Sequence, residues 1–492
     1  MNRLTDRKTA ASVKSNLEGL QAEFAEVYGV FRGARKSITV SYGGGQPSYV
    51  YRRLAKMAGS ETEAKASFGP AISSKAEAGA YLAKLGLSEA AAVLDVGEAY
   101  VNIRNKADFA IGKMEKQQVH GLYGDSLNLS ASQIDRQAEC RMSYFLKYGM
   151  RAKERKEATV DPAEFGTYVH AVLENTAREV MEKGGFHAVS MEETMDIAFR
   201  YADEYATQRF SQLESSRLQY LFHRNRRELE MVVEELWKEL KEARFAPSHF
   251  ELAFGGDGEM EAIGIPAREM TAVLRGFVDR VDLWNEDGRN YFRVVDYKTG
   301  KKDFDYCDVY NGVGLQMLLY LFALERSGEN AVGQHATAAG VQYFPARAPL
   351  VTADGRLSDE EAEQLRRSEW KRKGLLLQDD DVLQAMEPGD EMSRLCCTRK
   401  KDGTLSGDLA TREQLRLLET YVFGILGDMV DAIASGDVTP NPYTRGSSHD
   451  ACAFCPYGAV CRKNSVEGRR NYKAMTAREF WEHVEKEVQR RG

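Results

Sequence analysis

Two aspartates and a lysine stand out as residues that could do chemistry together. Asp296 and Lys298 lie two residues apart in VVDYK, and Asp279 lies earlier, in the apolar segment GFVDRVDLW. Side chains two residues apart on a β-strand point to the same face, so Asp296 and Lys298 share a face. If the two segments pair as a hairpin, two carboxylates converge beside an ammonium group at one edge of a sheet. Mg²⁺ prefers carboxylate oxygens, so the pattern predicts a cation site.

Such a site suits the hydrolysis of a phosphodiester. The reaction needs a polarised phosphate, an activated water and neutralisation of negative charge, and metal ions held by carboxylates supply all three. Lys298 would orient or deprotonate the water, because a lysine beside a metal site can have a lowered pKa. The alternative for an isolated Asp-x-Lys triplet is an ion pair on an exposed strand, since charges are common on protein surfaces.

Three cysteines form a second group whose spacing suggests chemistry. Cys452, Cys455 and Cys461 stand as C-x2-C-x5-C, and the chain has seven cysteines in all. Thiols this close together predict a metal site rather than three independent core residues. A site of four ligands needs one more residue, and the spacing alone is compatible with Zn²⁺.

The composition is that of a globular protein with several domains. The 492 residues are 43% hydrophobic and 29% charged, and 67 basic against 74 acidic residues give a net charge of −7. This balance excludes a uniformly basic nucleic-acid coat, so a DNA site must be a local groove. The longest strongly apolar stretch, 315–324, is shorter than the roughly 20 residues of a membrane span, and no secretory signal opens the sequence. We therefore expect no membrane segment and a cytoplasmic location.

Hydrophobic periodicity predicts the elements that must position these residues. They are a helix over 165–180, strands at 250–254, 271–284 and 291–298, a helix over 312–325 and a strand over 338–344. This order, α-β-β-β-α-β, describes one compact α/β module. Ser130 and Thr476 are expected to cap two further helices, and a long helix is expected over 411–435. The polar segment 350–410 predicts an insertion or connector.

The acidic segments resemble those of a known family. GFVDRVD (276–282) followed by VVDYKTGKK (294–302) is similar to motifs II and III of the PD-(D/E)XK nuclease superfamily, in its RecB-like branch. The resemblance implies a restriction-endonuclease-like core and a metal-dependent deoxyribonuclease, with exonuclease action expected. It also implies Mg²⁺ as the metal, with Mn²⁺ as a substitute, and products that carry a 5′-phosphate and a 3′-hydroxyl.

Two further segments extend the resemblance. FGTYVHAVLE (165–174) resembles the helix motif that brings a histidine, here His170, to the metal, so that His170, Asp279, Asp296 and the Tyr297 carbonyl are the implied ligands. Gln316 and Tyr320 in QMLLY resemble the QxxxY motif, which implies contact with the scissile strand or orientation of Lys298. The alternatives are a structural histidine and a core-facing helix with one hydrogen-bonded glutamine.

A cysteine upstream completes the thiol group. Cys140 lies in SQIDRQAECRMSYFLKYG, which resembles the family motif that precedes the nuclease core and supplies one cluster ligand. The resemblance therefore implies a [4Fe-4S] cluster on Cys140, Cys452, Cys455 and Cys461, with Zn²⁺ as the alternative. One thiolate before the nuclease core and three after it would close a very long loop of the chain. The cluster is therefore expected to be structural, an iron–sulfur staple that holds these two segments together. Cys307, Cys396 and Cys397 match no ligand pattern.

Together the motifs resemble the C-terminal portion of the B subunits of AddAB-type (RexAB-type) helicase–nucleases. The predicted parts are a helical region over 1–129 that resembles the end of a helicase-like part, the nuclease core with Cys140 over 130–345, a connector and helix over 346–438, and the cysteine cluster with a C-terminal helix over 439–492. The stretch SITVSYGGGQPS (37–48) carries the helicase-like resemblance.

The resemblance implies double-strand-break end processing, with DNA ends as substrate and an ATP-driven A-type helicase subunit as partner. No G-x-x-x-x-G-K-[ST] loop occurs in the sequence, so ATP binding is not expected of this chain. One alternative is a stand-alone RecB-like exonuclease of a phage or CRISPR-adaptation system. Another is a non-catalytic scaffold that binds DNA ends, although such a scaffold would not need Asp279, Asp296 and Lys298.

Overall fold

The fold is described from a computed structural model. It describes residues 28–29, 32–33, 35–37, 40, 49–58, 72, 74–107, 113–153, 162–210, 216–255, 258, 260–286, 288–300, 302–348, 358–389, 391–446, 448–461 and 468–492. The chain divides into two compact units, Met1–Phe109 and Ala110–Gly492.

The first unit contains the helices α2 (Tyr49–Ala58), α3 (Lys75–Leu85), α4 (Ser88–Val93) and α5 (Gly97–Ala107). The Ser74 side chain caps α3, and Gly86, at φ +74°, ends it. Leu82, Ala91 and Val96 form a small apolar core among α3, α4 and α5. The stretch 37–48, on which the helicase-like resemblance rests, lies largely outside the described residues.

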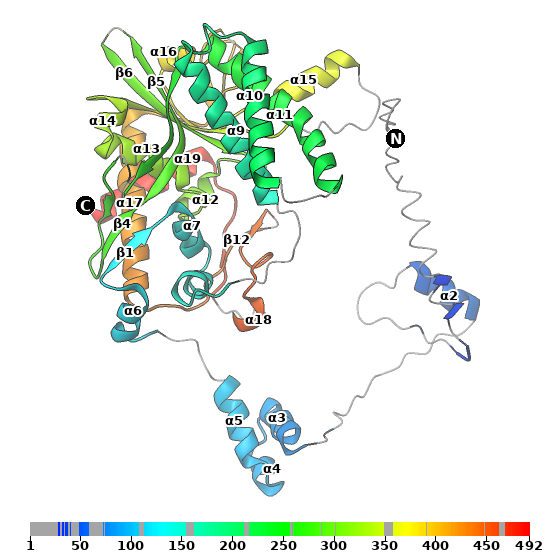
Figure 1. The fold of residues 1–492 in the computed structure, drawn as a ribbon. Helices are drawn as coiled ribbons and strands as arrows, with labels where there is room; N and C mark the ends of the chain where they lie inside the picture. The colour runs from blue at the N-terminus through cyan, green and yellow to red at the C-terminus, as the bar shows by residue number, and fades with distance from the viewer. Residues whose placement is uncertain are drawn as a thin grey trace. The chain divides into compact units, whose positions relative to one another are not determined.

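A six-stranded sheet organises the second unit (Figure 1). Its order is β11 (Leu409–Ala410), β8 (Lys373–Leu377), β7 (Thr337–Pro345), β6 (Arg289–Lys298), β5 (Gly276–Glu286) and β2 (Ala246–Phe254). The pairs β2–β5, β5–β6 and β7–β8 are antiparallel, whereas β6–β7 and β8–β11 are parallel. The parallel pair β6–β7 requires a crossover, which α13 (Gln316–Ser327) supplies.

Helices cover both faces of this sheet (Figure 1). On one face, α9 (Pro162–Glu182), α10 (Met191–Phe210) and α11 (Ser216–Glu242) belong to an apolar cluster that includes Val295 and Tyr297 of β6. On the other face, α13, α17 (Arg412–Ala434) and α19 (Ala477–Arg491) belong to a cluster that includes Val294. Neighbouring residues of β6 thus enter different cores, as the alternation of a strand requires.

The predicted order α-β-β-β-α-β is confirmed by α9, β2, β5, β6, α13 and β7, with α10 and α11 inserted after α9. The predicted strand 271–284 is wrong as one element. It breaks at Arg275 into β4 (Thr271–Leu274) and β5, and the Arg275 amide donates to the Leu129 carbonyl of β1 (Ser126–Leu129). β4 therefore pairs with β1 and with β3 (Ile263–Ile265) in a separate sheet.

The polar segment after β7 contributes more than a connector. It supplies the strands β8 and β11 to the central sheet, a role that its composition did not predict. It also contains α15 (Asp359–Glu369), α16 (Asp380–Met386), β9 (Cys397–Arg399) and β10 (Leu405–Gly407). The predicted caps at Ser130 and Thr476 are confirmed, since each forms a capping box with the residue three positions later. Thr411 caps α17 in the same way.

α7 (Ala131–Glu139) ends directly before Cys140, which is its C-cap residue. α8 (Arg141–Tyr144) and a π-helical turn (Phe145–Gly149) follow directly. The remaining elements of the unit are α6 (Lys116–Tyr123), α12 (Tyr306–Tyr310), α14 (Glu329–Val332), β12 (Tyr443–Arg445), β13 (His449–Asp450), α18 (Gly458–Cys461) and β14 (Arg470–Asn471). Among the helices of the described ranges, none has the length and apolar character that crossing a bilayer requires.

Candidate active site

The predicted acidic residues meet where strands β5 and β6 stop pairing. The last paired residues of the two strands at this end are Arg280 and Val295. Just beyond this pair, the Tyr297 amide donates to Asp279 Oδ2 at 3.0 Å. The Asp279 carboxylate therefore takes up a backbone donor at the point where the strands diverge. Lys298 Nζ lies 2.5 Å from Asp296 Oδ2, so these two side chains form an ion pair at the same end of the sheet.

His170 reaches this point from α9. Its Nδ1 lies 3.3 Å from Asp279 Oδ2, and its Nε2 lies 2.7 Å from the Tyr297 carbonyl oxygen. Neighbouring ligands of an octahedral Mg²⁺ stand about 3.0 Å apart, since each lies about 2.1 Å from the ion. Because a carbonyl oxygen can only accept, His170 Nε2 donates a hydrogen bond to it in this structure. A cation that replaced the shared proton would bind both atoms as adjacent ligands.

Glu251 of β2, which was not predicted from the sequence, joins the cluster. One potential ligand atom from each of His170, Glu251 and Asp279 lies within 4.8 Å of the other two. β2 pairs with β5 at Phe250–Arg280 and Leu252–Val278, which sets Glu251 opposite Asp279. Glu251 has φ +50°, a strained conformation for a residue with a side chain, and such strain clusters at functional sites. A charged residue in the otherwise apolar strand FELAF was the available signal.

The electrostatics of the cluster favour a cation. Burial raises the pKa of Asp296 to about 6, and the neighbouring Asp279 carboxylate adds to this shift while Lys298 opposes it. Partial desolvation raises the pKa of Glu251 to about 7, with further contributions from Asp279 and Glu174. Crowded carboxylates resist ionisation in this way until a positive charge enters the site.

Helix α13 places the QxxxY pair behind Asp296. Gln316 Nε2 lies 3.5 Å from Asp296 Oδ1 and 3.2 Å from the Tyr320 hydroxyl. Tyr320 is buried and makes an edge contact with Phe254, at 5.5 Å between ring centroids. Burial also raises the pKa of Tyr320 above its usual range, so this hydroxyl stays protonated and supports Gln316.

A buried network of charged residues contacts the Tyr297 side chain on the face of the sheet that α11 covers. Arg280 donates to the Tyr297 hydroxyl at 3.1 Å and pairs with Asp282 at 2.8 Å, and both side chains have no exposed surface. Glu239 of α11 accepts from Arg372 at 2.5 Å and lies 2.9 Å from Arg293. Although burial opposes its ionisation, Arg372, Arg293 and Arg280 hold the pKa of Glu239 below its usual value.

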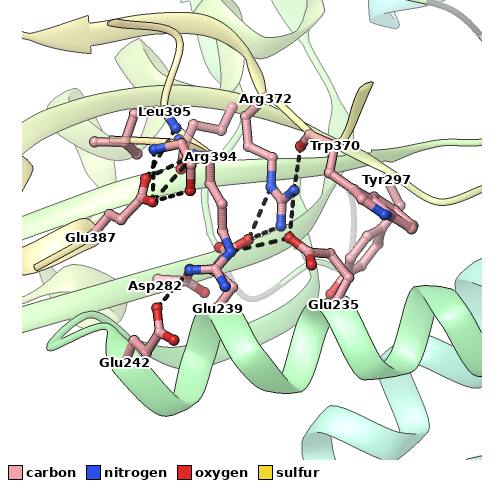
Figure 2. Close-up of polar contacts among 12 residues, drawn as sticks. Glu235, Glu239, Glu242, Asp282, Tyr297, Trp370, Arg372, Glu387, Arg394 and Leu395 are labelled. Atoms are coloured by element: carbon pink, nitrogen blue, oxygen red, sulfur yellow. Dashed lines mark hydrogen bonds and ion pairs between the residues drawn. The ribbon is translucent and has the colours of Figure 1, made fainter. Parts of the chain in front are cut away.

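The same network extends along α11 (Figure 2). Arg372 and Arg394 both reach Glu235, at 3.2 and 3.1 Å, and Arg394 also reaches Glu242. Because α11 is tied to β5, β6 and the segment before β8, Tyr297 is held from its hydroxyl end. Its backbone carbonyl and amide, which face His170 and Asp279, are thereby fixed in place.

The cysteines separate into two groups. Cys140, Cys452, Cys455 and Cys461 line one pocket together with Met142, Ser143, Pro440, Pro442, Ala451 and Tyr457. The pocket therefore brings together the four residues that the sequence predicts as ligands. Cys307, Cys396 and Cys397 are instead buried.

Comparison with known proteins agrees with this geometry. The family model of the PD-(D/E)XK nuclease superfamily matches residues 128–462, and the chain belongs to this superfamily. Over 391 residues it is 32% identical to the B subunit of the ATP-dependent helicase/deoxyribonuclease of Clostridium novyi (strain NT), a match that covers 77% of this chain and 34% of that protein.

A second relative gives a similar picture. The chain is 35% identical over 366 residues to the B subunit of the ATP-dependent helicase/deoxyribonuclease of Moorella thermoacetica (strain ATCC 39073 / JCM 9320), a match that covers 73% of this chain and 31% of that protein. The predicted resemblance to B subunits of helicase–nucleases is confirmed by these matches. The chain spans about a third of the length of these curated relatives.

Proposed function

We propose that the chain is a divalent-metal-dependent deoxyribonuclease whose active site lies at the end of β5 and β6. The observation that carries the proposal is the convergence of His170, Glu251 and Asp279 on one point, with the Asp296–Lys298 pair beside it. This oxygen-rich donor set fits Mg²⁺ or Mn²⁺. His170, Asp279, Asp296 and the Tyr297 carbonyl would hold the ion, and Glu251 is a further candidate ligand.

The bound ion would polarise the phosphate and offset the negative charge that develops during hydrolysis. Lys298 is fixed by Asp296, and its ammonium group would orient the attacking water at the same end of the sheet. Gln316 donates to Asp296 and would keep that carboxylate turned toward the ion. The expected products carry a 5′-phosphate and a 3′-hydroxyl.

We further propose a [4Fe-4S] cluster on Cys140, Cys452, Cys455 and Cys461, which share one pocket. Four thiolates can hold either a [4Fe-4S] cluster or Zn²⁺. The resemblance of the segments that carry these cysteines to those of iron–sulfur nucleases favours the [4Fe-4S] cluster.

The cellular role proposed is the processing of DNA ends within a helicase–nuclease. It rests on the relatives, which are named as B subunits of an ATP-dependent helicase/deoxyribonuclease. Since the sequence has no phosphate-binding G-x-x-x-x-G-K-[ST] loop, an ATP-driven A-type subunit would supply translocation.

The test is digestion of end-labelled linear single- and double-stranded DNA, with Mg²⁺ or with EDTA and without ATP. The variants are Lys298→Ala and, as a matched control, Lys373→Ala, whose half-exposed side chain lies 3.7 Å from Asp303 on the surface. We expect cleavage that requires Mg²⁺, that is lost by more than about 100-fold in Lys298→Ala and that is unchanged in Lys373→Ala. Cleavage that survives Lys298→Ala would place the activity elsewhere, whereas DNA-end binding without cleavage, even with an A-type subunit added, would favour the scaffold.

A further inference from the structure

Helix α13, which carries Gln316 and Tyr320, begins without a cap of its own. Its N-cap residue is Leu315, whose side chain makes no capping hydrogen bond. The first amides of a helix need acceptors, and the positive end of the helix dipole attracts an anion. The position of this end of α13 therefore depends on contacts with other parts of the fold.

Asp135 of α7, although distant in the sequence, makes such a contact with the turn before α13. Asp135 Oδ1 accepts from the Gly314 amide at 2.9 Å, two residues before α13 begins at Gln316. Gly314 has φ +71°, so the chain turns sharply into α13 at the residue that Asp135 contacts. The ammonium group of Lys302 also faces this point, and a Cβ placed on Gly314 would lie 3.4 Å from it.

The turn before α13 also packs between the two segments that flank the cysteine pocket. Val313 shares a small apolar cluster with Ala138 of α7 and Tyr443 of β12. At Gly312 (φ +80°) an added Cβ would meet Met429 at 2.4 Å and Ala138 at 3.5 Å, so the approach is close. Arg470, from β14, donates to the Ala138 carbonyl, which ties α7 to the segment after the cysteines.

We propose that Asp135 is a positioning residue for the nuclease centre: by holding the turn into α13 from α7, it keeps Gln316 against Asp296 and ties this helix to the segment that ends at Cys140. The inference rests on the proposed function and adds to it a link between the cysteine site and the catalytic helix. The Gln316–Asp296 contact is already long, at 3.5 Å, so a small shift of α13 breaks it.

The experiment compares Asp135→Ala with Asp135→Asn, which keeps an oxygen acceptor for the Gly314 amide. The control is Ser132→Ala, an exposed position on the same helix. Asp135→Ala is expected to lower kcat for Mg²⁺-dependent DNA cleavage by about 10–100-fold, as a displacement of about 1 Å does at an active site. KM for DNA should stay within about threefold of the wild-type value, and Asp135→Asn should recover most of kcat.

A double variant separates positioning from general destabilisation. If Asp135 acts through Gln316, then Asp135→Ala combined with Gln316→Ala loses no more kcat than Gln316→Ala alone. If the kcat losses of the two single variants multiply in the double variant, the proposal is overturned. It is also overturned if Asp135→Ala keeps the wild-type kcat, or if Asp135→Asn loses as much kcat as Asp135→Ala. If Asp135→Ala does not fold, Asp135→Ser, which is too short to reach the amide, takes its place with the same expected results.

Amide hydrogen exchange tests this contact independently of activity. Asp135→Ala should speed exchange at Gly314, Leu315 and the first turn of α13 by more than about tenfold, and should leave α17 unchanged. Unchanged exchange at these amides would overturn the proposal. If the wild-type chain cleaves no DNA, the proposed function fails, while this exchange measurement still decides whether Asp135 fixes α13.

Discussion

Replacing Glu251 by glutamine removes one charge from the cluster at His170 and Asp279 while it keeps the shape of the side chain. Desolvation, with the charge of Asp279, raises the pKa of Glu251 to about 7. Glu251 is therefore about one-tenth ionised at pH 6 and about nine-tenths ionised at pH 8 when no metal is bound. Because only the ionised form attracts a cation strongly, the effect of the substitution must depend on pH.

The size of this dependence follows from the pKa. The ratio of Mg²⁺ dissociation constants, Glu251→Gln over wild type, should rise about tenfold from pH 6 to pH 8. At pH 8 the ratio itself should reach about 10–100, the range for groups that support a metal site. Asp296 titrates in both proteins, so its contribution largely cancels in the ratio.

The assay is isothermal titration with Mg²⁺ at pH 6, 7 and 8 and constant ionic strength. Glu174→Gln is the matched control, because Glu174 lies near Glu251 but pairs with Arg178 at 2.8 Å. Its ratio should stay within about twofold at every pH, because Arg178 already offsets the charge of Glu174 in this partly exposed pair. A ratio near one at all three pH values for Glu251→Gln would refute the reasoning, since Glu251 would then not face the cation.

Three further predictions concern stability and cofactors. Glu239→Gln should lower the free energy of unfolding of the second unit by about 3–5 kcal/mol in urea titrations, because it leaves buried arginines without their charged partner. A loss below about 1 kcal/mol would contradict this prediction. Asp296 and Glu251 have folded-state pKa values of about 6 and 7, above their unfolded values, so their contribution to stability is present at low pH and is lost as the pH rises through about 7. Mg²⁺ relieves this repulsion, so it should raise the melting temperature more at pH 8 than at pH 5.5, and an equal rise would argue against a cation among these carboxylates. Cys140→Ser should remove the broad absorbance near about 400 nm and the bound iron from anaerobically purified protein, whereas a colourless wild-type protein that contains zinc would reject the iron–sulfur assignment.

The hairpin of the candidate active site was predictable because its signals are local. Asp279, Asp296 and Lys298 stand in two neighbouring apolar segments, and alternation along each strand determines which face each side chain takes. The pairing of Arg280 with Val295 bears out the register that brings the two aspartates together. The cysteine trio was likewise visible from spacing, whereas Cys140 could be assigned only from a family resemblance.

Glu251 could not be assigned from the sequence for a physical reason. Its place in the cluster depends on the pairing of β2 with β5 and on a backbone φ of +50°, and neither is encoded in local periodicity. The buried network was hidden in a similar way. Arg280 and Asp282 alternate along β5 as charged residues of a solvent-facing strand do, yet Glu239 of α11 covers them. Tertiary packing decided both features.

The most direct test of the central claim is to locate the metal. Crystals of the chain grown with Mn²⁺ should show an anomalous difference peak at the end of β5 and β6, bounded by His170, Asp279, Asp296 and the Tyr297 carbonyl. The same preparation should cleave DNA with Mn²⁺ or Mg²⁺. A preparation that cleaves DNA while this position holds no metal would contradict the account, because the nuclease centre would then lie elsewhere in the chain.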